Sequence, residues 1–319
     1  MRFWEKIRNG TLPITRSRGR FWDMHQYYCL FNATRVPEFP IDRIYRYFKT
    51  EARMQWADKS WNIIVCKDGQ VLLQGDVGFF SCFLIFIKQS FRVNLVRFEG
   101  YGNDLARKLN LYMDTVVQIA LQLAFLRTHG SFAPIYETAS TRKFYHGRTE
   151  TVRGCTHEMV AFGQAIIDGQ SKEEQQQLFF AAYEAHNKLM DDCMDGRGID
   201  RHLYGLRKTL ENFRIRGSLN IETPEIFTDE AWKVSGGDGN YLLSTSFSGY
   251  MADDEVGFYG FVTAMRPDGY GTFYRIGRNS VQLVITDWCQ SKSNLSAYGE
   301  NIKWSLTKLG SLFTYRAKL

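Results

Sequence analysis

The sequence predicts a mixed α/β fold over residues 95–316, and three patterns carry this prediction. Residues 115–128 place apolar side chains at helical spacing, and residues 171–174 match a capping box that opens a second long helix toward Met190. After residue 236 the chain changes to short apolar runs separated by turn residues, which are typical of strands. A last amphipathic segment, residues 295–313, again has helical spacing. Helices followed by a mostly sequential set of strands favour a mixed sheet flanked by helices.

Upstream of this domain, one strand is predicted. The run from Trp61 to Lys67 is largely apolar and is followed by Asp68 and Gly69, a pair that favours a turn. We therefore expect a buried strand that enters a turn at this point. The longest apolar run, residues 77–87, is too short to span a bilayer and fits a buried strand or a core helix.

Three helices are predicted in the first half of the domain. Asp114 stands where the N-cap of the first helix belongs, and Gly130 follows its last apolar turn, where glycine often ends a helix. This helix is apolar on nearly every side, so we expect it to be central. Ser171 and Glu174 match a capping box and predict the start of the second helix. The third helix is expected to begin near Asp200.

The strands of the domain are expected after the glycine pair at 236–237. Their predicted ranges are 241–247, 256–265, 271–276 and 281–288. Residues 277–280 fit a hairpin turn between the last two strands.

The composition excludes several classes of protein. Hydrophobic residues make up 44% and charged residues 23% of the chain, as in ordinary folded soluble proteins, which excludes disorder throughout. The net charge of +6 fits anionic small molecules as well as nucleic acid and decides for neither. The six cysteines form no CxxC pair, so we expect no zinc, redox or other metal motif. The opening residues lack a secretory pattern, and the scattered cysteines suggest a reducing compartment.

Polar residues gather in four segments, 101–114, 136–151, 198–203 and 244–246. Residues 136–151 combine hydroxyls and paired charges after a buried helix, and such a run can line a polar pocket. The commoner alternative is a capped turn at the surface. Residues 101–114 offer basic side chains before a helix, which suits a phosphate group or, equally, a solvated charged loop.

The other two segments also have two explanations each. Arg201 at a helix start is unusual because the helix dipole repels a cation there. It fits either a bidentate site for a carboxylate or a simple surface ion pair with Asp200. Ser244 and Ser246 fall on one face of a predicted strand, where hydroxyl donors can stabilise an oxyanion. The propensity of Ser and Thr for a sheet edge explains them equally.

Together these segments resemble the choline/carnitine acyltransferase family. The resemblance rests on strings that occur in the order of the family, namely Gln118–Arg127 (QIALQLAFLR), Tyr136–Arg153 (YETASTRKFYHGRTETVR), Asp200–Leu206 (DRHLYGL), Ser244–Ser246 (STS) and Pro267–Gly271 (PDGYG). It covers almost all of residues 95–316 and, in pieces, residues 12–76. Residues 144–146 and 235–250 look most like the peroxisomal octanoyltransferase members of the family.

The resemblance implies an activity and a set of site residues. The family transfers an acyl group between coenzyme A and carnitine, with a histidine as general base. For this chain it implies a medium-chain, octanoyl-like acyl group, coenzyme A as a co-substrate, and no tightly bound cofactor. It places Ser244 and Ser246 at the reacting centre, where the second serine helps to hold the oxyanion. The residues implied for the carboxylate end of carnitine are Tyr136, Thr138, Thr149 and Arg201. The residues implied for coenzyme A are Arg107, Asp114, Glu137 and Asn103, the last where the family has a basic residue.

The chain departs from the family upstream. Val77 stands where the family has its catalytic histidine, and valine cannot accept a proton. His146 and His202 lie in family strings where neither is the base, so structural roles are expected for them. Residues 1–94 are expected to be a truncated remnant of the first, N-terminal lobe, and residues 95–316 the C-terminal, acyltransferase-like lobe.

The last three residues, Ala317 to Leu319, resemble a peroxisomal targeting signal. They imply a peroxisomal location and an import receptor as partner. Neither nucleic acid nor a transmembrane segment is expected.

Three interpretations stay open. The chain is a carnitine O-acyltransferase for medium-chain acyl groups, or a pseudoenzyme that binds carnitine or acyl-CoA without turnover. The third is an incomplete product of a longer gene, with no stable fold alone. The family strings support the first interpretation, and the missing base together with the short first lobe opposes it.

Overall fold

In a computed structural model of the chain, the structure describes residues 91–215, 222–251 and 260–316, together with short stretches before residue 76. It divides into two units, residues 1–88 with 141–148 and residues 89–140 with 149–319. Each unit is described by itself.

The described stretches of the first unit contain three antiparallel strand pairs. These are β1 (Arg16–Ser17) with β2 (Arg20–Phe21), β3 (Ala33–Val36) with β4 (Arg43–Arg46), and β5 (Trp61–Val65) with β6 (Val71–Gly75). The strand predicted from Trp61 is therefore confirmed. The apolar run 77–87 lies outside the described residues, as do Val77 and the three-residue C-terminal tail.

The second unit is built on a six-stranded sheet in the order β7-β12-β11-β10-β8-β9. Its strands are β7 (Phe91–Phe98), β8 (Ile135–Ser140), β9 (Thr149–Val152), β10 (Leu243–Tyr250), β11 (Tyr270–Ile276) and β12 (Val281–Trp288). Strand β10 runs parallel to both of its neighbours, and all other pairs are antiparallel. The sheet is thus mixed, as the sequence predicts.

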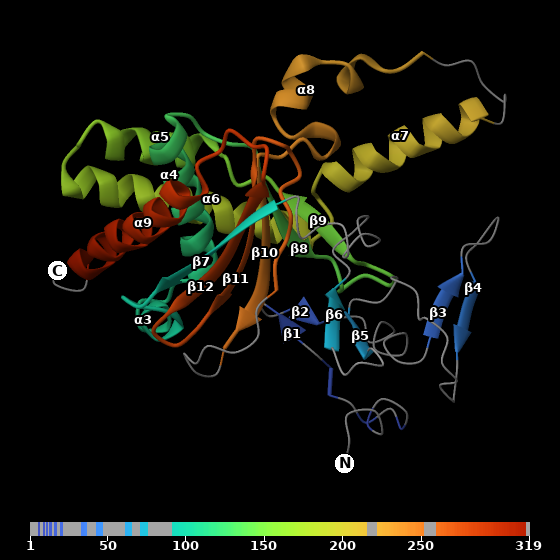
Figure 1. The fold of residues 1–319 in the computed structure, drawn as a ribbon, viewed down its shortest axis with the longest axis horizontal. Coiled ribbons are helices and arrows are strands. Elements are labelled where there is room, and N and C mark those ends of the chain that lie inside the picture. The colour runs from blue at the N-terminus through green and yellow to red at the C-terminus, as the bar shows by residue number, and fades with distance from the viewer. Residues whose placement is uncertain are drawn as a thin grey trace. The chain divides into compact units, whose positions relative to one another are not determined.

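Helices cover one face of this sheet (Figure 1). They are α4 (Met113–His129), α5 (His157–Ile167), α6 (Lys172–Met194) and α9 (Leu295–Arg316). The short helix α3 (Asn103–Lys108) lies beside the β11–β12 turn, because the Asn103 amide donates to Gly277 O at 2.9 Å. Helix α7 (Asp200–Ile215) projects away from the sheet, and the short segments η2 (Glu225–Phe227), α8 (Glu230–Val234) and η3 (Gly237–Gly239) follow it (Figure 1). No helix in the described part of the chain is long and apolar enough to cross a bilayer.

Helix α4 forms the centre of the core. Every residue from Met113 to Leu126 is buried, which confirms the prediction of a central helix. Gly130 ends it in the left-handed conformation, with φ of 70°, as glycine permits at a helix C-terminus. The prediction for Asp114 is wrong, because the N-cap is Tyr112 and Asp114 lies inside the first turn. Its carboxylate points into the core and accepts a hydrogen bond there instead of capping the helix.

The predicted starts of the next two helices are confirmed. The Ser171 hydroxyl accepts from the Glu174 amide, and the Glu174 carboxylate accepts from the Ser171 amide, so the capping box is complete. Helix α6 then runs to Met194, beyond the predicted end at Met190. Helix α7 begins at Asp200.

Three of the four predicted strands of the domain are present as β10, β11 and β12, with the Gly277 amide closing the hairpin onto Ser280 O at 2.8 Å. The strand predicted over 256–265 is wrong in its described part, residues 260–265, which have no strand pairing. These residues cross the sheet on the face away from the helices. Side chains of β12 hold them there, since Thr286 Oγ1 donates to Val262 O at 2.6 Å.

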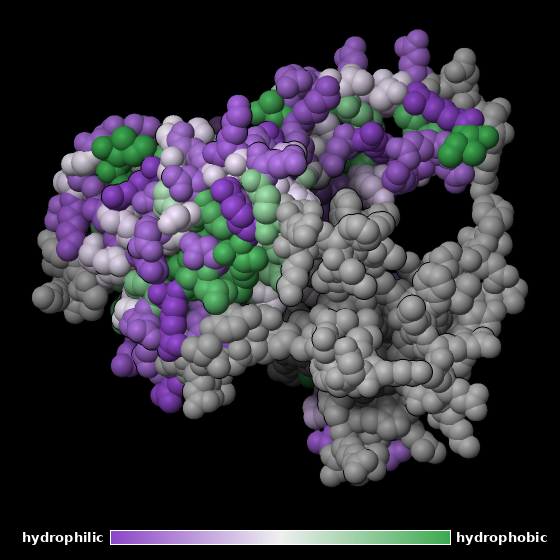
Figure 2. All heavy atoms as spheres, in the orientation of Figure 1, coloured by the Kyte–Doolittle hydropathy of each residue, from purple (hydrophilic) through white to green (hydrophobic). Residues whose placement is uncertain are grey.

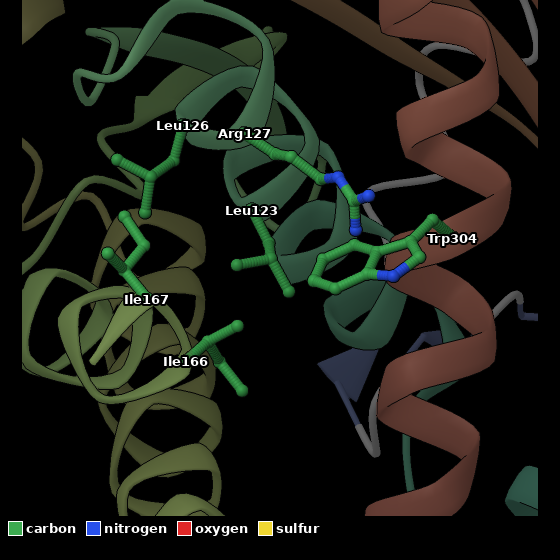
Figure 3. A pocket seen from close by; sticks show the side chains of 6 residues that line it. All are labelled: Leu123, Leu126, Arg127, Ile166, Ile167 and Trp304. Atoms are coloured by element: carbon green, nitrogen blue, oxygen red, sulfur yellow. The ribbon is translucent and has the colours of Figure 1, made fainter. Parts of the chain in front are cut away.

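A shallow apolar pocket lies on the outer side of the helix layer, between α4, α5 and α9. It is lined by Leu123, Leu126, Arg127, Ile166, Ile167 and Trp304 (Figure 3). The Arg127 guanidinium lies 3.8 Å from the centre of the Trp304 ring and covers one side of it. The helices themselves separate this pocket from the other face of the sheet, the open face, which no described helix covers (Figure 1).

Candidate functional site

The two serines of β10 face away from the helices. Neighbouring Thr245 faces the helices, because its hydroxyl accepts from Gln118 Nε2 of α4 at 3.0 Å and donates to Tyr136 O at 2.6 Å. Side chains alternate along a strand, so Ser244 and Ser246 occupy the opposite face. Ser244 is buried, whereas Ser246 is partly exposed.

Strand β8 adds two more hydroxyls to the same face. Ser244 pairs with Tyr136 in the parallel register of β10 and β8, which places their side chains on one side of the sheet. Thr138, two residues further along β8, shares that side, and its hydroxyl lies 3.4 Å from the Tyr136 hydroxyl. Both side chains are partly exposed. The serine pair and this hydroxyl pair are therefore adjacent on the open face.

Arg201 of α7 reaches the same group of hydroxyls. Its Nη2 donates to the Tyr136 hydroxyl at 3.3 Å and to Thr149 Oγ1 at 3.1 Å, and its Nε donates to Thr149 O at 3.1 Å. All of these acceptors are neutral oxygens, so they hold the guanidinium in place without cancelling its charge. The structure thus brings together the six residues predicted for the carnitine and reacting-centre positions.

The start of α7 is anchored by charged side chains that sequence reasoning did not assign. Arg153 donates to both carboxylate oxygens of Asp200, each at 2.8 Å, and the Tyr241 hydroxyl donates to the same carboxylate at 2.9 Å. The buried Glu150 carboxylate accepts from the backbone amide of Arg201 at 3.2 Å. Asp200 therefore pairs with Arg153, and the alternative of a simple surface pair between Asp200 and Arg201 is wrong.

The pKa values of Tyr241 and Arg153 are shifted in the directions that keep both side chains protonated, so both remain hydrogen-bond donors to Asp200. Burial raises the pKa of Tyr241, and the negative charge of Asp200 raises it further, so the phenol stays protonated and can donate. Burial opposes the charge of Arg153, but the hydrogen bond to Asp200 and the nearby negative charges raise the pKa of its guanidinium overall. Arg153 lies inside the string that carries the family resemblance, yet nothing in its spacing marks it as a site residue.

Two residues predicted for coenzyme A lie on the helix side of the sheet. The carboxylate of Asp114 accepts from the Tyr274 hydroxyl at 2.5 Å, and Gln118 Nε2 donates to that hydroxyl at 2.7 Å. Glu137 is buried with its Oε2 at 2.9 Å from His186 Nε2. Burial and the charges of Asp114 and Glu137 raise the pKa of the Tyr274 phenol well above its ordinary value, so it remains a donor.

The other two residues predicted for coenzyme A lie on α3, beside the β11–β12 turn. Arg107 is exposed in the last turn of α3, and Asn103 is its first residue. An ion pair between Arg278 and Asp104 at 3.0 Å ties α3 to the turn. The four residues predicted for coenzyme A therefore do not form one contiguous group in the second unit.

Two described histidines, His186 and His129, have side-chain partners that lie away from the β10 serines. His186 pairs with Glu137 behind the sheet, and His129 Nε2 lies 2.9 Å from the Tyr270 hydroxyl. Burial lowers the pKa of His129, which keeps its ring neutral near neutral pH. In the described part of the chain, no group of three or more His, Cys, Asp or Glu residues is arranged to hold a metal ion.

Comparison with known proteins decides the family. Residues 1–55 and 86–304 match the sequence profile described as choline/carnitine O-acyltransferase. The chain belongs to this family. The match leaves out residues 56–85, the stretch that contains Val77.

Named relatives agree with this membership. The chain is 43% identical to the peroxisomal carnitine O-octanoyltransferase of Rattus norvegicus over 192 residues, which cover 60% of this chain and 30% of that protein. The Homo sapiens protein of the same name is 42% identical over the same length. The muscle isoform of carnitine O-palmitoyltransferase 1 from Bos taurus is 35% identical over 222 residues, 68% of this chain and 28% of that protein. The matched region of this family member thus spans less than a third of the length of these relatives.

Proposed function

We propose that the open face around Arg201 binds carnitine through its carboxylate and that the chain takes part in moving a medium-chain acyl group between coenzyme A and carnitine. The proposal rests chiefly on one observation. Among the described residues, the side chain of Arg201 donates only to neutral oxygens, so its positive charge is held beside the β10 serines without a carboxylate partner. A guanidinium in that state is the group that best recognises a carboxylate ligand.

Each neighbour has a role in this proposal. Tyr136 and Thr149 orient the guanidinium and offer hydroxyls to the ligand carboxylate, and Thr138 extends this row. A carnitine held there by its carboxylate presents its hydroxyl and acyl oxygen toward Ser244 and Ser246. The Ser246 hydroxyl then donates to the oxyanion that forms when the acyl group is transferred.

Coenzyme A is the proposed second substrate, released and rebound in each turnover rather than held as a tight cofactor. Arg107 is exposed and cationic, which suits a phosphate group, and Asn103 lies one turn before it. Asp114 and Glu137 lie on the helix side of the sheet, so their proposed role is indirect: they stabilise the strands and do not contact coenzyme A. The names of the octanoyltransferase relatives support a peroxisomal location, and the tail from Ala317 to Leu319 is the proposed contact for an import receptor.

A second candidate function is supported by the sequence at the base position. Val77 cannot accept a proton, and general-base catalysis typically contributes about 10²–10⁴-fold in rate. A protein that binds carnitine or acyl-CoA without transferring the acyl group fits this residue better than an efficient enzyme does.

The binding proposal is tested by calorimetric titration of the full chain with L-carnitine. We expect Arg201→Gln to weaken binding about tenfold or more, because a charged hydrogen-bond donor to a carboxylate is lost. Arg207→Gln is the matched control, since Arg207 lies on the same helix but is paired with Asp238 and Glu211. Equal losses in the two variants, or no binding by the unmodified chain, would contradict the proposal.

The two candidate functions are separated by thiol release from octanoyl-CoA, measured with and without carnitine. Carnitine-dependent release by the unmodified chain identifies an enzyme. Binding without release identifies the non-catalytic candidate, and we then expect Val77→His to gain release. A cooperative thermal melt of the same sample excludes a chain without a stable fold.

A further inference from the structure

Asp200 and Arg201 are neighbours in sequence, yet their side chains have separate partners. The Asp200 carboxylate accepts from Arg153 Nε, from Arg153 Nη2 and from the Tyr241 hydroxyl. Arg201 donates to Tyr136 and Thr149 instead. An acidic and a basic side chain side by side at a helix start are thus kept from neutralising each other.

Arg153 is itself held so that it cannot leave Asp200 easily. Its guanidinium lies 5.0 Å from the ring centre of Trp232 and 5.6 Å from that of Tyr241, within the range of cation–π attraction. Its Nη1 donates to Ser235 O at 2.8 Å. Its side chain is 21% exposed, and that of Asp200 is 12% exposed, so water screens this pair only weakly.

We propose that Arg153 is a positioning residue that occupies Asp200 and so keeps the charge of Arg201 available to an anionic ligand. This inference rests on the proposed function, in which Arg201 binds the carboxylate of carnitine. Without Arg153, the Asp200 carboxylate would lose its only cationic partner among the described residues. The nearest replacement along the chain is Arg201, and pairing with it would compete directly with the ligand carboxylate.

The proposal predicts an unusual pattern in a double-mutant cycle. Calorimetry with L-carnitine is carried out on the full chain and on Arg153→Gln, Asp200→Asn and the double variant. We expect Arg153→Gln to weaken carnitine binding about tenfold, because the exposed carboxylate captures Arg201. The double variant should return to within about threefold of the unmodified chain, because it has no carboxylate to capture Arg201. A double variant as weak as Arg153→Gln or weaker would show that Arg153 acts only in folding and would overturn the proposal.

A second measurement does not depend on carnitine. Phenylglyoxal modifies accessible arginines, and peptide mass spectrometry reports the rate at Arg201 alone. We expect this rate to fall in Arg153→Gln and to recover in the double variant. If the unmodified chain fails to bind carnitine while this pattern is present, the proposed function fails and the role of Arg153 stands. An unchanged rate at Arg201 in Arg153→Gln overturns that role.

Folding is controlled by a variant that keeps the charge. Arg153→Lys retains a cation beside Asp200, so we expect it to keep carnitine affinity within about threefold of the unmodified chain. If Arg153→Gln does not fold, Arg153→Lys and Asp200→Asn still test the idea, since both should bind nearly normally. A loss of tenfold or more in folded Asp200→Asn would mean that Asp200 itself supports the ligand, and it would overturn the proposal.

Discussion

The hydroxyl of Thr245 connects helix α4 to the backbone of strand β8. It donates to the backbone of Tyr136, which carries a predicted ligand-binding side chain, and it accepts from Gln118. Gln118 in turn donates to Tyr274, whose hydroxyl donates to Asp114. Because every hydroxyl in this chain of contacts is buried, each lost partner leaves an unpaired polar atom in the core.

We therefore expect Thr245→Val to lower the free energy of unfolding by about 1–2 kcal/mol, although the two side chains have nearly the same shape. Thr138→Val is the matched control, because Thr138 is partly exposed on the other face. Urea denaturation of both variants measures the difference. A Thr245→Val variant as stable as the control would show that the buried network contributes nothing measurable.

Cys193 is a second residue whose chemistry follows from its surroundings. Burial, together with the charges of Glu150, Asp200 and other carboxylates, raises the pKa of its thiol to about 12. At about pH 8 the thiol is therefore protonated, and only the thiolate is nucleophilic. We expect iodoacetamide to leave Cys193 unmodified in the folded chain while exposed Cys289 reacts, as read by peptide mass spectrometry.

The raised pKa of Cys193 also makes the free energy of unfolding depend on pH. The folded state keeps the Cys193 proton at pH values where the unfolded state, with an ordinary pKa of 9.0, loses it. The contribution is therefore complete below about pH 9 and is lost as the pH rises toward 12. Rapid alkylation of Cys193 at about pH 8 without denaturant would contradict both the burial and the pKa shift.

At the level of elements, the helices differ in how they are stabilised. Helix α4 is held by burial on all sides, whereas α6 begins at the surface and depends more on its capping box. Helix α7 has no buried residue, so its order depends on polar anchors, at its first turn through Arg201 and further along through the Arg207–Asp238 ion pair. Sequence patterns alone identified the starts of α6 and α7, because N-terminal signals are local.

We expect Ser171→Ala to cost about 1 kcal/mol of stability, because the Glu174 amide loses its hydroxyl acceptor and the Glu174 carboxylate loses the hydroxyl donor at the start of α6. Thr209→Ala is a suitable control, since Thr209 is exposed within α7 and its hydroxyl bonds only to Gly205 O of the same helix. That variant should be neutral or slightly stabilising, because alanine has the higher helix propensity. Thermal melts of the two variants decide between these outcomes.

The strands show where sequence reasoning stops. Strands β8 and β9 were not predicted, because both of their faces carry polar side chains. In β8, Glu137 faces the helices and pairs with His186, while Thr138 faces the site, so no alternation of apolar and polar residues is visible. The N-cap role predicted for Asp114 is wrong for a related reason. An acidic residue near a helix start is usually a cap, whereas the carboxylate of Asp114 is a buried hydrogen-bond acceptor.

The site could be predicted only through the family strings. Arg201, Tyr136 and the serines come together because the sheet register and α7 bring distant segments side by side, which spacing cannot show. The role of Asp200 depends on Arg153, which lies far from it in sequence. Pairings of this kind are tertiary, and they become visible only in the folded chain.

At the level of the whole molecule, one edge of the sheet is exposed and apolar. Val93 is 51% and Leu95 is 61% exposed on β7, which pairs with β12 alone among the described strands. Figure 2 shows hydrophobic residues gathered where Figure 1 places this strand. An unpaired edge with apolar side chains is a template for contact with another chain.

We expect Leu95→Lys to reduce self-association of the full chain, because a charge on an edge strand opposes strand pairing between molecules. Light scattering over a range of concentrations measures the effect. Ile167→Lys is the matched control, since Ile167 is 56% exposed on helix α5 and away from any strand edge. Similar decreases in the two variants would show that general hydrophobicity, and not the β7 edge, causes the association.

Helix α7 buries no residue, yet it carries Arg201 on its first turn. The free energy that orders this helix therefore comes from its anchors and from any anion that Arg201 holds. Ligand binding and the stability of α7 are therefore thermodynamically coupled. Each ligand that binds Arg201 must also lower the rate at which the backbone amides of this helix exchange with solvent.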